Sequence, residues 1–305
     1  MKTFILFPLL VFSILLGFSQ QDAQFTQYMY NTSNINPAYA GSRDVLSIFA
    51  LHRTQWVGLD GAPVTNTINI NTPIGSNIGI GLGIINDRIG VSDENNISAD
   101  FSYTIQASDN YKLAFGLKAS ANILNIAFDK LSYAVADPSF ETNLNKKISP
   151  NIGTGLYFYS DNTYIGLSVP NFLETRHYDR TSTINSAKIT AQERMHFYFI
   201  AGHVFDLSEN IQFKPSLLTK IVQGAPLQID ASANFMINQK FIIGGAYRWS
   251  AAASVMAGFQ INESWLIGYG FDLETTRLKA YNSGSHEVFL RYELPKQKIV
   301  HPRFF

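Results

Sequence analysis

Two long runs of alternating apolar and polar residues, joined by a short polar turn, constrain the fold of this chain more than any other feature. They cover residues 94–106 and 111–125, and the turn between them contains Ser108, Asp109 and Asn110. Apolar side chains occupy every second position, so one face of each strand is apolar and the other polar. Each run has roughly 10 to 14 residues, about twice the usual length of a strand in a globular protein. Such a length is typical of a tilted strand that crosses a bilayer.

The first residues have the pattern of an export signal. Lys2 is followed by an apolar run over residues 4–16 and then by small residues. This arrangement predicts a signal peptide over residues 1–19, cleaved ahead of Gln20. A membrane anchor is the weaker alternative, because a spanning helix needs ~18 to 20 apolar residues. The chain has no cysteine, so we expect neither a lipid-attached N-terminus nor disulfides.

The composition favours an outer-membrane protein. Charged residues make up 15% of the chain, against about 25% in a soluble domain, and the chain has 23 Phe and 15 Tyr. After the signal, no apolar stretch is long enough for a membrane helix, which leaves a closed β-barrel as the spanning structure. Lys plus Arg and Asp plus Glu both number 23, and this zero net charge gives no reason to expect nucleic acid as a partner.

Alternation and turn residues predict an all-β fold, a transmembrane antiparallel outer-membrane β-barrel of about 14 strands over residues 43–294. The predicted strands are 43–53, 64–73, 77–88, 94–106, 111–125, 148–159, 162–170, 194–206, 211–222, 226–237, 241–249, 252–261, 264–272 and 285–294. A soluble β-sandwich with one solvated face is the alternative. It fits less well, because turns in a sandwich recur about every 8 to 12 residues.

The connections between the predicted strands alternate between short and long. The longer ones are 54–63, 126–147, 171–193 and 273–284, and we expect them to face the cell exterior while the short turns face the periplasm. Both termini are then expected in the periplasm. The predicted barrel is preceded by an N-terminal periplasmic or lumenal strap over residues 20–42 and followed by a C-terminal periplasmic tail over residues 295–305.

Three glycines alternate on the polar face of the third predicted strand, at Gly79, Gly81 and Gly83. Positions without a side chain allow another backbone to approach closely. The alternative is that they relieve crowding inside a tightly curved wall. Both interpretations place the three residues on the lumen side of the barrel.

Several short motifs carry a family resemblance. They are residues 21–29 (QDAQFTQYM), 34–42 (NINPAYAGS), 53–58 (RTQWVG), 61–63 (GAP), 164–170 (YIGLSVP) and 284–287 (GSHE). With them the chain resembles the PorP/SprF family of type IX secretion system outer-membrane proteins of the Bacteroidota, over essentially the whole mature chain.

This resemblance implies a role in type IX secretion and gliding motility. A member of the family is expected to bind, deliver or anchor a large secreted cargo, an adhesin-like protein with a C-terminal sorting domain, at the cell surface. Other type IX secretion components and outer-membrane lipid are the remaining expected partners. The resemblance implies no enzymatic activity, and we expect no cofactor. The alternative function is a passive diffusion channel or a hydrophobic-ligand transporter, which would conduct ions or take up ligand as the barrel alone.

The candidate partner-binding residues are Phe25, Tyr28, Asn36, Pro37, Tyr39, Arg53, Gln55, Trp56, Gly58, Gly61, Pro63, Gly284, Ser285, His286 and Glu287. Those of the strap could pack into the barrel or onto a periplasmic partner. The guanidinium of Arg53 beside the indole of Trp56 suits capture of a partner. Alternatively, Trp56 belongs to an aromatic girdle and Arg53 braces the lumen wall.

The histidines do not predict a catalytic or metal site. His196 and His203 are seven residues apart, so on one strand they point to opposite faces and cannot bind the same metal ion. Ser285 and His286 are neighbours on a predicted strand and also point apart, which argues against a Ser-His catalytic pair. We therefore expect no catalytic residue and no bound metal.

Overall fold

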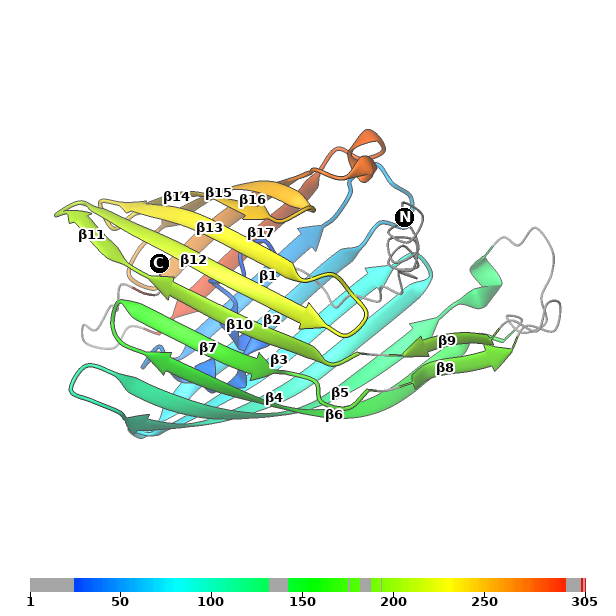
Figure 1. Ribbon diagram of the computed structural model, residues 1–305, viewed down its shortest axis with the longest axis horizontal. Coiled ribbons are helices and arrows are strands. Elements are labelled where there is room, and N and C mark those ends of the chain that lie inside the picture. The colour runs from blue at the N-terminus through cyan, green and yellow to red at the C-terminus, as the bar shows by residue number, and fades with distance from the viewer. Residues whose placement is uncertain are drawn as a thin grey trace, which may run out of the picture.

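The chain folds into a closed antiparallel β-barrel (Figure 1). A computed structural model describes residues 25–131, 142–174, 176–181, 188–192, 194–294, 303 and 305. The main sheet has 15 strands, of which β11 (Phe205–Ser208) continues β10 along β12, so 14 strands form the wall. These 14 are β1 (Ser47–Thr54), β2 (Val64–Ile74), β3 (Ile78–Ile89), β4 (Ser92–Gln106), β5 (Lys112–Ile126), β6 (Leu144–Tyr159), β7 (Thr163–Val169), β10 (His196–His203), β12 (Ile211–Val222), β13 (Gln228–Ile237), β14 (Phe241–Arg248), β15 (Ala252–Gln260), β16 (Trp265–Glu274) and β17 (Ser285–Glu293). The predicted fold class and strand number are confirmed.

The wall alternates between an apolar outer face and a polar inner face. On β4, Asp100 and Ser102 are buried towards the lumen, whereas Phe101 and Tyr103 are exposed on the outside. Large apolar side chains are exposed in the same way on most strands, and such a surface is stable when lipid covers it. Close to the short turns, aromatic pairs such as Trp265 with Tyr292, whose ring centroids are 4.8 Å apart, form an interfacial girdle.

The two ends of the barrel differ. One end, here called the short-turn end, carries the tight turns, the start of β1 and the end of β17, and Phe305 lies there (Figure 1). The other, the long-loop end, carries the connections 55–63, 127–143, 170–195 and 275–284. Within 171–193, expected to be only a loop, β8 (Arg176–Thr181) and β9 (Lys188–Gln192) form a hairpin that extends beyond the wall. In the described part of the chain, no helix is long and apolar enough to cross a bilayer.

Residues 25–46, here called the inner segment, run through the lumen from the long-loop end to the short-turn end. The segment contains the short helix α2 (Thr32–Ile35) and the 3-10 turn η1 (Pro37–Tyr39), and residues 25–43 are buried except for the half-buried Asn34. Phe25 therefore lies at the long-loop end. The expected start of the mature chain at Gln20 lies outside the described residues, so the periplasmic position of that terminus stays a prediction. The predicted signal peptide over 1–19 lies outside the described residues, as does most of the predicted tail.

Glycines of the wall let the inner segment lie directly against the strands. A Cβ at Gly79 would be 2.1 Å from the carbonyl oxygen of Ala40, and one at Gly116 would be 2.1 Å from the main-chain nitrogen of Ala38. The close-approach interpretation therefore holds at Gly79. At Gly83 a Cβ would instead meet the side chain of Asn69 at 2.7 Å, so this glycine relieves crowding within the wall.

Candidate functional site

The inner segment is fastened at the long-loop end by a buried cluster of charges, here called the anchor cluster, made of Thr26, Arg53, Asp272 and Glu287. Arg53 is on β1 and is 1% exposed. Its Nη2 donates to Asp272 Oδ2 at 2.7 Å, and its Nη1 donates to Glu287 Oε2 at 3.1 Å. The register of the sheet brings these three side chains together, because Arg53 lies directly opposite Glu287 on β17, and β17 pairs with β16, which carries Asp272.

Thr26 joins the inner segment to this cluster through its side chain and its backbone. The hydroxyl accepts from Arg53 Nη1 at 2.7 Å and donates to Asp272 Oδ2 at 2.6 Å. The carboxylate of Glu287 accepts from the main-chain nitrogens of Thr26 and Gln27, both at 3.0 Å. These N–H groups are buried, and a buried donor without a partner is unfavourable. Glu287 therefore fixes the position at which the inner segment enters the lumen.

The anchor cluster fixes geometry more than it adds net stability. Desolvation of buried charges offsets most of their attraction, whereas removal of one partner costs about 3–5 kcal/mol because a charge is left buried. A second ion pair near the same end, Arg248 Nε with Asp230 Oδ1 at 2.8 Å, also contacts the segment, since Arg248 Nη2 donates to the carbonyl oxygen of Phe25 at 3.4 Å. The inner segment is thus held by specific polar contacts at its start.

Above the anchor cluster, two long loops are joined into one surface, here called the rim, made of residues 55–63 and 275–284. The main-chain nitrogen of Trp56 donates to Ser285 Oγ at 3.1 Å, and the indole Nε1 donates to Glu274 Oε2 at 3.1 Å. The main-chain nitrogen of Val57 donates to the carbonyl oxygen of Gly284 at 2.9 Å. The main-chain nitrogen of Ser283 donates to the carbonyl oxygen of Val57 at 2.8 Å. Trp56 has a φ of 45°, a left-handed conformation that bulky residues rarely adopt, and this reverses the chain after β1.

The structure divides the candidate residues of the sequence into three groups. Phe25, Tyr28, Asn36, Pro37, Tyr39, Arg53, Pro63, Gly284, Ser285 and Glu287 are buried; Gln55, Trp56 and His286 are half-buried; Gly58 and Gly61 are exposed. His286 lies on the outer face, where its Nδ1 is 2.7 Å from the hydroxyl of Tyr269. Only the rim members Gln55, Trp56, Gly58 and Gly61 lie where a partner outside the barrel could contact them without displacing other residues.

The sequence interpretation missed Thr26, Asp272 and Glu274. Asp272 and Glu287 sit at the long-loop ends of adjacent predicted strands and on the face shared with Arg53, so a register-based search of inward-facing charges would have found that group. No sequence signal marked Thr26, because its role depends on the path of the inner segment.

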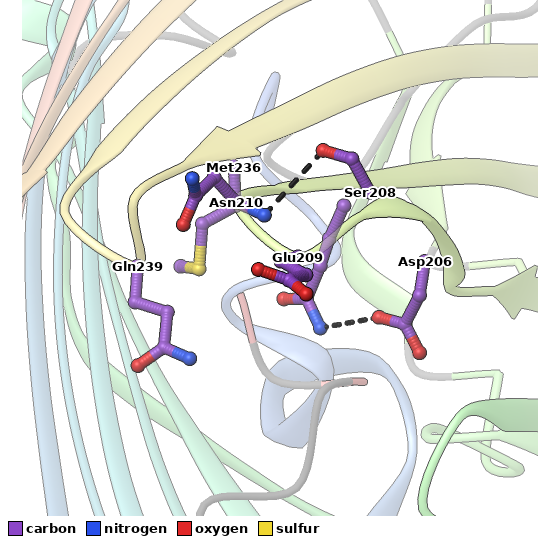
Figure 2. Close-up of a pocket in the computed structure, with 7 residues that line it drawn as sticks. Asp206, Ser208, Glu209, Asn210, Met236 and Gln239 are labelled. Carbon is purple, nitrogen blue, oxygen red and sulfur yellow. Dashed lines mark hydrogen bonds between the residues drawn. The ribbon is translucent and has the colours of Figure 1, made fainter.

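A pocket of about 410 Å³ lies at the short-turn end (Figure 2). It is lined by Asp206, Ser208, Glu209, Asn210, Gln212, Met236 and Gln239. Gln212 Nε2 donates to Asp206 Oδ1 at 2.8 Å, so part of the polar lining is already satisfied internally. The lining contains no nucleophile with an adjacent base, and the described residues include no group of His, Asp and Glu side chains that could hold a metal ion.

Comparison with known proteins gives a family and a fold. A family model described as type IX secretion system membrane protein PorP/SprF matches residues 17–292. A search of curated protein sequences found no match. The CymD monoaromatic hydrocarbon channel is similar in structure, with 12% identity, a TM-score of 0.51 and coverage of 90% of this chain and 94% of that chain. The Pseudomonas putida toluene transporter TodX is also similar in structure, with 10% identity, a TM-score of 0.51 and coverage of 90% of this chain and 98% of that chain. At such low identity these two similarities establish the barrel fold alone.

Proposed function

The chain belongs to the PorP/SprF family of type IX secretion system membrane proteins, and from this premise we propose that it binds a secreted cargo protein and anchors or delivers it at the cell surface. The cargo class is an adhesin-like protein with a C-terminal sorting domain. The observation that carries the proposal is the filled lumen: residues 25–43 occupy it, buried and hydrogen-bonded to the wall. Binding at the rim is therefore favoured over passage of cargo through the barrel.

The rim has the properties of a preorganised binding surface. Its two loops are linked through Trp56 and Gly284, so they present their exposed groups in one fixed arrangement. A surface that is ordered before binding loses less conformational entropy when a partner arrives. The exposed aromatic ring of Tyr281 and the exposed carboxylate of Asp60 add apolar and charged contacts. Other secretion components would approach the short-turn end, and lipid would surround the outer face.

The second candidate function is a diffusion channel or a hydrophobic-ligand transporter. The barrel fold shared with CymD and TodX is compatible with it. The inner segment argues against it, because Ser102 Oγ binds the carbonyl oxygen of Ala40 at 2.7 Å and Ser168 Oγ binds that of Ile35 at 2.6 Å, deep in the lumen. We expect no enzymatic activity.

The proposal is tested by the amount of cargo that remains with the protein. A tagged chain is purified from native outer membranes in mild detergent, as wild type, as Trp56→Ala and as the control Trp265→Ala, whose indole lies in the girdle at the opposite end. We expect Trp56→Ala to recover several-fold less of a large secreted protein, and Trp265→Ala to recover the wild-type amount. Equal recovery from all three would contradict recognition at the rim.

A further inference from the structure

A second buried polar site lies in the lumen at the short-turn end and is centred on Lys214 of β12. Lys214 is 0% exposed, and its Nζ donates to the carbonyl oxygen of Arg303 at 2.7 Å and to the main-chain oxygen of Phe305. The amine also lies 5.5 Å from the ring centroid of Phe305 and 5.8 Å from that of Tyr164. A buried lysine is normally paired with a carboxylate, but here the described partners are main-chain oxygens near the end of the chain.

Arg303 occupies a fitted position beside Lys214. Its Nη2 donates to the carbonyl oxygen of Ser42 at 2.7 Å, its Nη1 donates to that of Ser160, and its Cζ lies 4.5 Å from the ring centroid of Tyr159. Its main-chain nitrogen donates to the carbonyl oxygen of Asp161 at 3.0 Å. A planar guanidinium that stacks on an aromatic ring and donates to two carbonyls is recognised by shape as well as by charge.

The surroundings of Lys214 carry an excess of positive charge. Arg291 and Arg43 act on Lys214 electrostatically, and so does the neighbouring Arg303, whose Nη1 also lies 3.9 Å from Asp161 Oδ1. Glu293 Oε1 forms an ion pair with Arg43 Nε and lies 3.5 Å from Arg291 Nε. In the described part of the chain, no side-chain carboxylate forms an ion pair with Lys214 itself. Oxygen ligands that carry negative or partial negative charge are therefore favoured at the Lys214 amine.

Within the described part of the chain, two buried groups next to Lys214 have no hydrogen-bond partner. Asn234 lies directly opposite Lys214 in the β12–β13 register, is 0% exposed, and neither atom of its amide has a partner among the described residues. The same holds for the hydroxyl of Tyr30, whose ring centroid lies 5.6 Å from the Lys214 Nζ. Buried polar atoms are normally satisfied, so these groups indicate capacity for further polar contacts with a ligand.

We propose that the buried surroundings of Lys214 form a binding site for a peptide tail with the pattern Arg-x-Phe. The Lys214 site comprises the side chains of Tyr30, Tyr159, Tyr164, Lys214 and Asn234 together with the carbonyls of Ser42 and Ser160. Arg303 and Phe305 of this chain are its resident ligand, and a separate peptide of the same chemistry competes with them. Because Ser42 belongs to the inner segment, an occupied site also ties that segment to the short-turn end.

The test uses the full chain in detergent and a synthetic peptide with the sequence of residues 299–305, fluorescently labelled at its N-terminus. Phe305→Ala weakens the resident ligand, so this variant is expected to bind the peptide at least tenfold more tightly than the wild type in fluorescence anisotropy. Adding Lys214→Met to Phe305→Ala is expected to reduce the affinity at least tenfold. Adding Lys112→Met to Phe305→Ala instead is expected to leave the affinity unchanged. Lys112 is a half-exposed lysine near the same end of the barrel, and its Nζ lies 3.9 Å from Asp44 Oδ2.

Circular dichroism and resistance to SDS at room temperature establish that each variant keeps its barrel. Failure of the folded Phe305→Ala chain to bind the peptide would overturn the proposal. Binding that is equally strong with and without Lys214, or to a peptide in which both Arg303 and Phe305 are replaced by alanine, would also overturn it.

Discussion

The carboxylate of Glu287 accepts a 3.0 Å hydrogen bond from the main-chain nitrogen of Thr26, 261 positions earlier in the chain. This contact joins the last strand of the barrel to the first described residues and fixes where the chain enters the lumen. The same carboxylate meets Arg53 on the first strand. One side chain therefore links the closure of the barrel to the placement of the inner segment.

The first prediction concerns this link. Glu287→Gln keeps the size of the side chain but removes its charge, which leaves Arg53 with one buried carboxylate fewer. We expect the free energy of unfolding to fall by about 3 kcal/mol, the lower end of the cost of breaking a buried ion pair. The free energy of unfolding is measured by denaturant titration, with tryptophan fluorescence as the signal. Glu263→Gln, in an exposed turn at the other end, serves as the control and should change stability by less than about 0.5 kcal/mol.

The second prediction concerns the glycine beneath the inner segment. Gly116→Ala places a Cβ 2.1 Å from the main-chain nitrogen of Ala38, so the segment has to shift. Overpacking of this kind costs about 1–3 kcal/mol. We expect a lower midpoint of thermal unfolding and faster protease cleavage within residues 25–43. Gly245→Ala is the matched control, since its Cβ would meet only a carbonyl oxygen at 3.4 Å. Identical behaviour of the two variants would show that the segment does not lie against Gly116.

The third prediction separates a filled barrel from a channel. The wild-type protein reconstituted into planar bilayers is expected to show no stable ion conductance, because the inner segment occupies the lumen. Gly116→Ala, which loosens the segment, is expected to produce intermittent conductance. Steady wild-type conductance, or saturable uptake of a small aromatic hydrocarbon by wild-type proteoliposomes, would favour the transporter function.

The fourth prediction isolates one hydrogen bond of the rim. Trp56→Phe keeps an aromatic ring but loses the indole donor to Glu274. Hydrogen bonds to charged groups contribute about 1.5–3 kcal/mol when buried, and less at a half-exposed position such as this one. We expect global stability to change by less than about 1 kcal/mol while cargo recovery falls. A stability loss without a change in cargo recovery would assign Trp56 a purely structural role.

The sequence was sufficient to predict the wall of the barrel. Lipid on one side and a polar lumen on the other impose period-two alternation on the strands. The strand predicted over 211–222, for example, is observed as β12 with the same bounds. The faces followed as well, since Asp230 and Ser232 are buried while Phe235 is exposed. Local pattern and strand register are thus strongly coupled in a membrane barrel.

The inner segment and the β8–β9 hairpin could not be predicted in the same way. The path of residues 25–46 is decided by contacts with residues far along the chain, such as Asn36 with the carbonyl oxygen of Leu156 at 3.0 Å. The role of Arg53 could not be predicted from the local sequence either, because that sequence is compatible with partner capture and with a place in the lumen wall. Its 1% exposure and its pairing with Asp272 and Glu287 put it in the lumen, with its guanidinium holding the inner segment.

The most direct test of cargo binding at the rim is site-specific cross-linking on intact cells. The chain contains no cysteine, so Asp60→Cys introduces a single thiol on the exposed rim for a photoreactive label, and Glu263→Cys introduces one at the short-turn end as the control. After illumination, the tagged protein is purified and its cross-linked partners are identified by mass spectrometry. We expect a large secreted protein to be cross-linked from position 60 and not from position 263. The same cargo cross-linked only from position 263, or no cargo from position 60 in cells that display it, would contradict recognition at the rim.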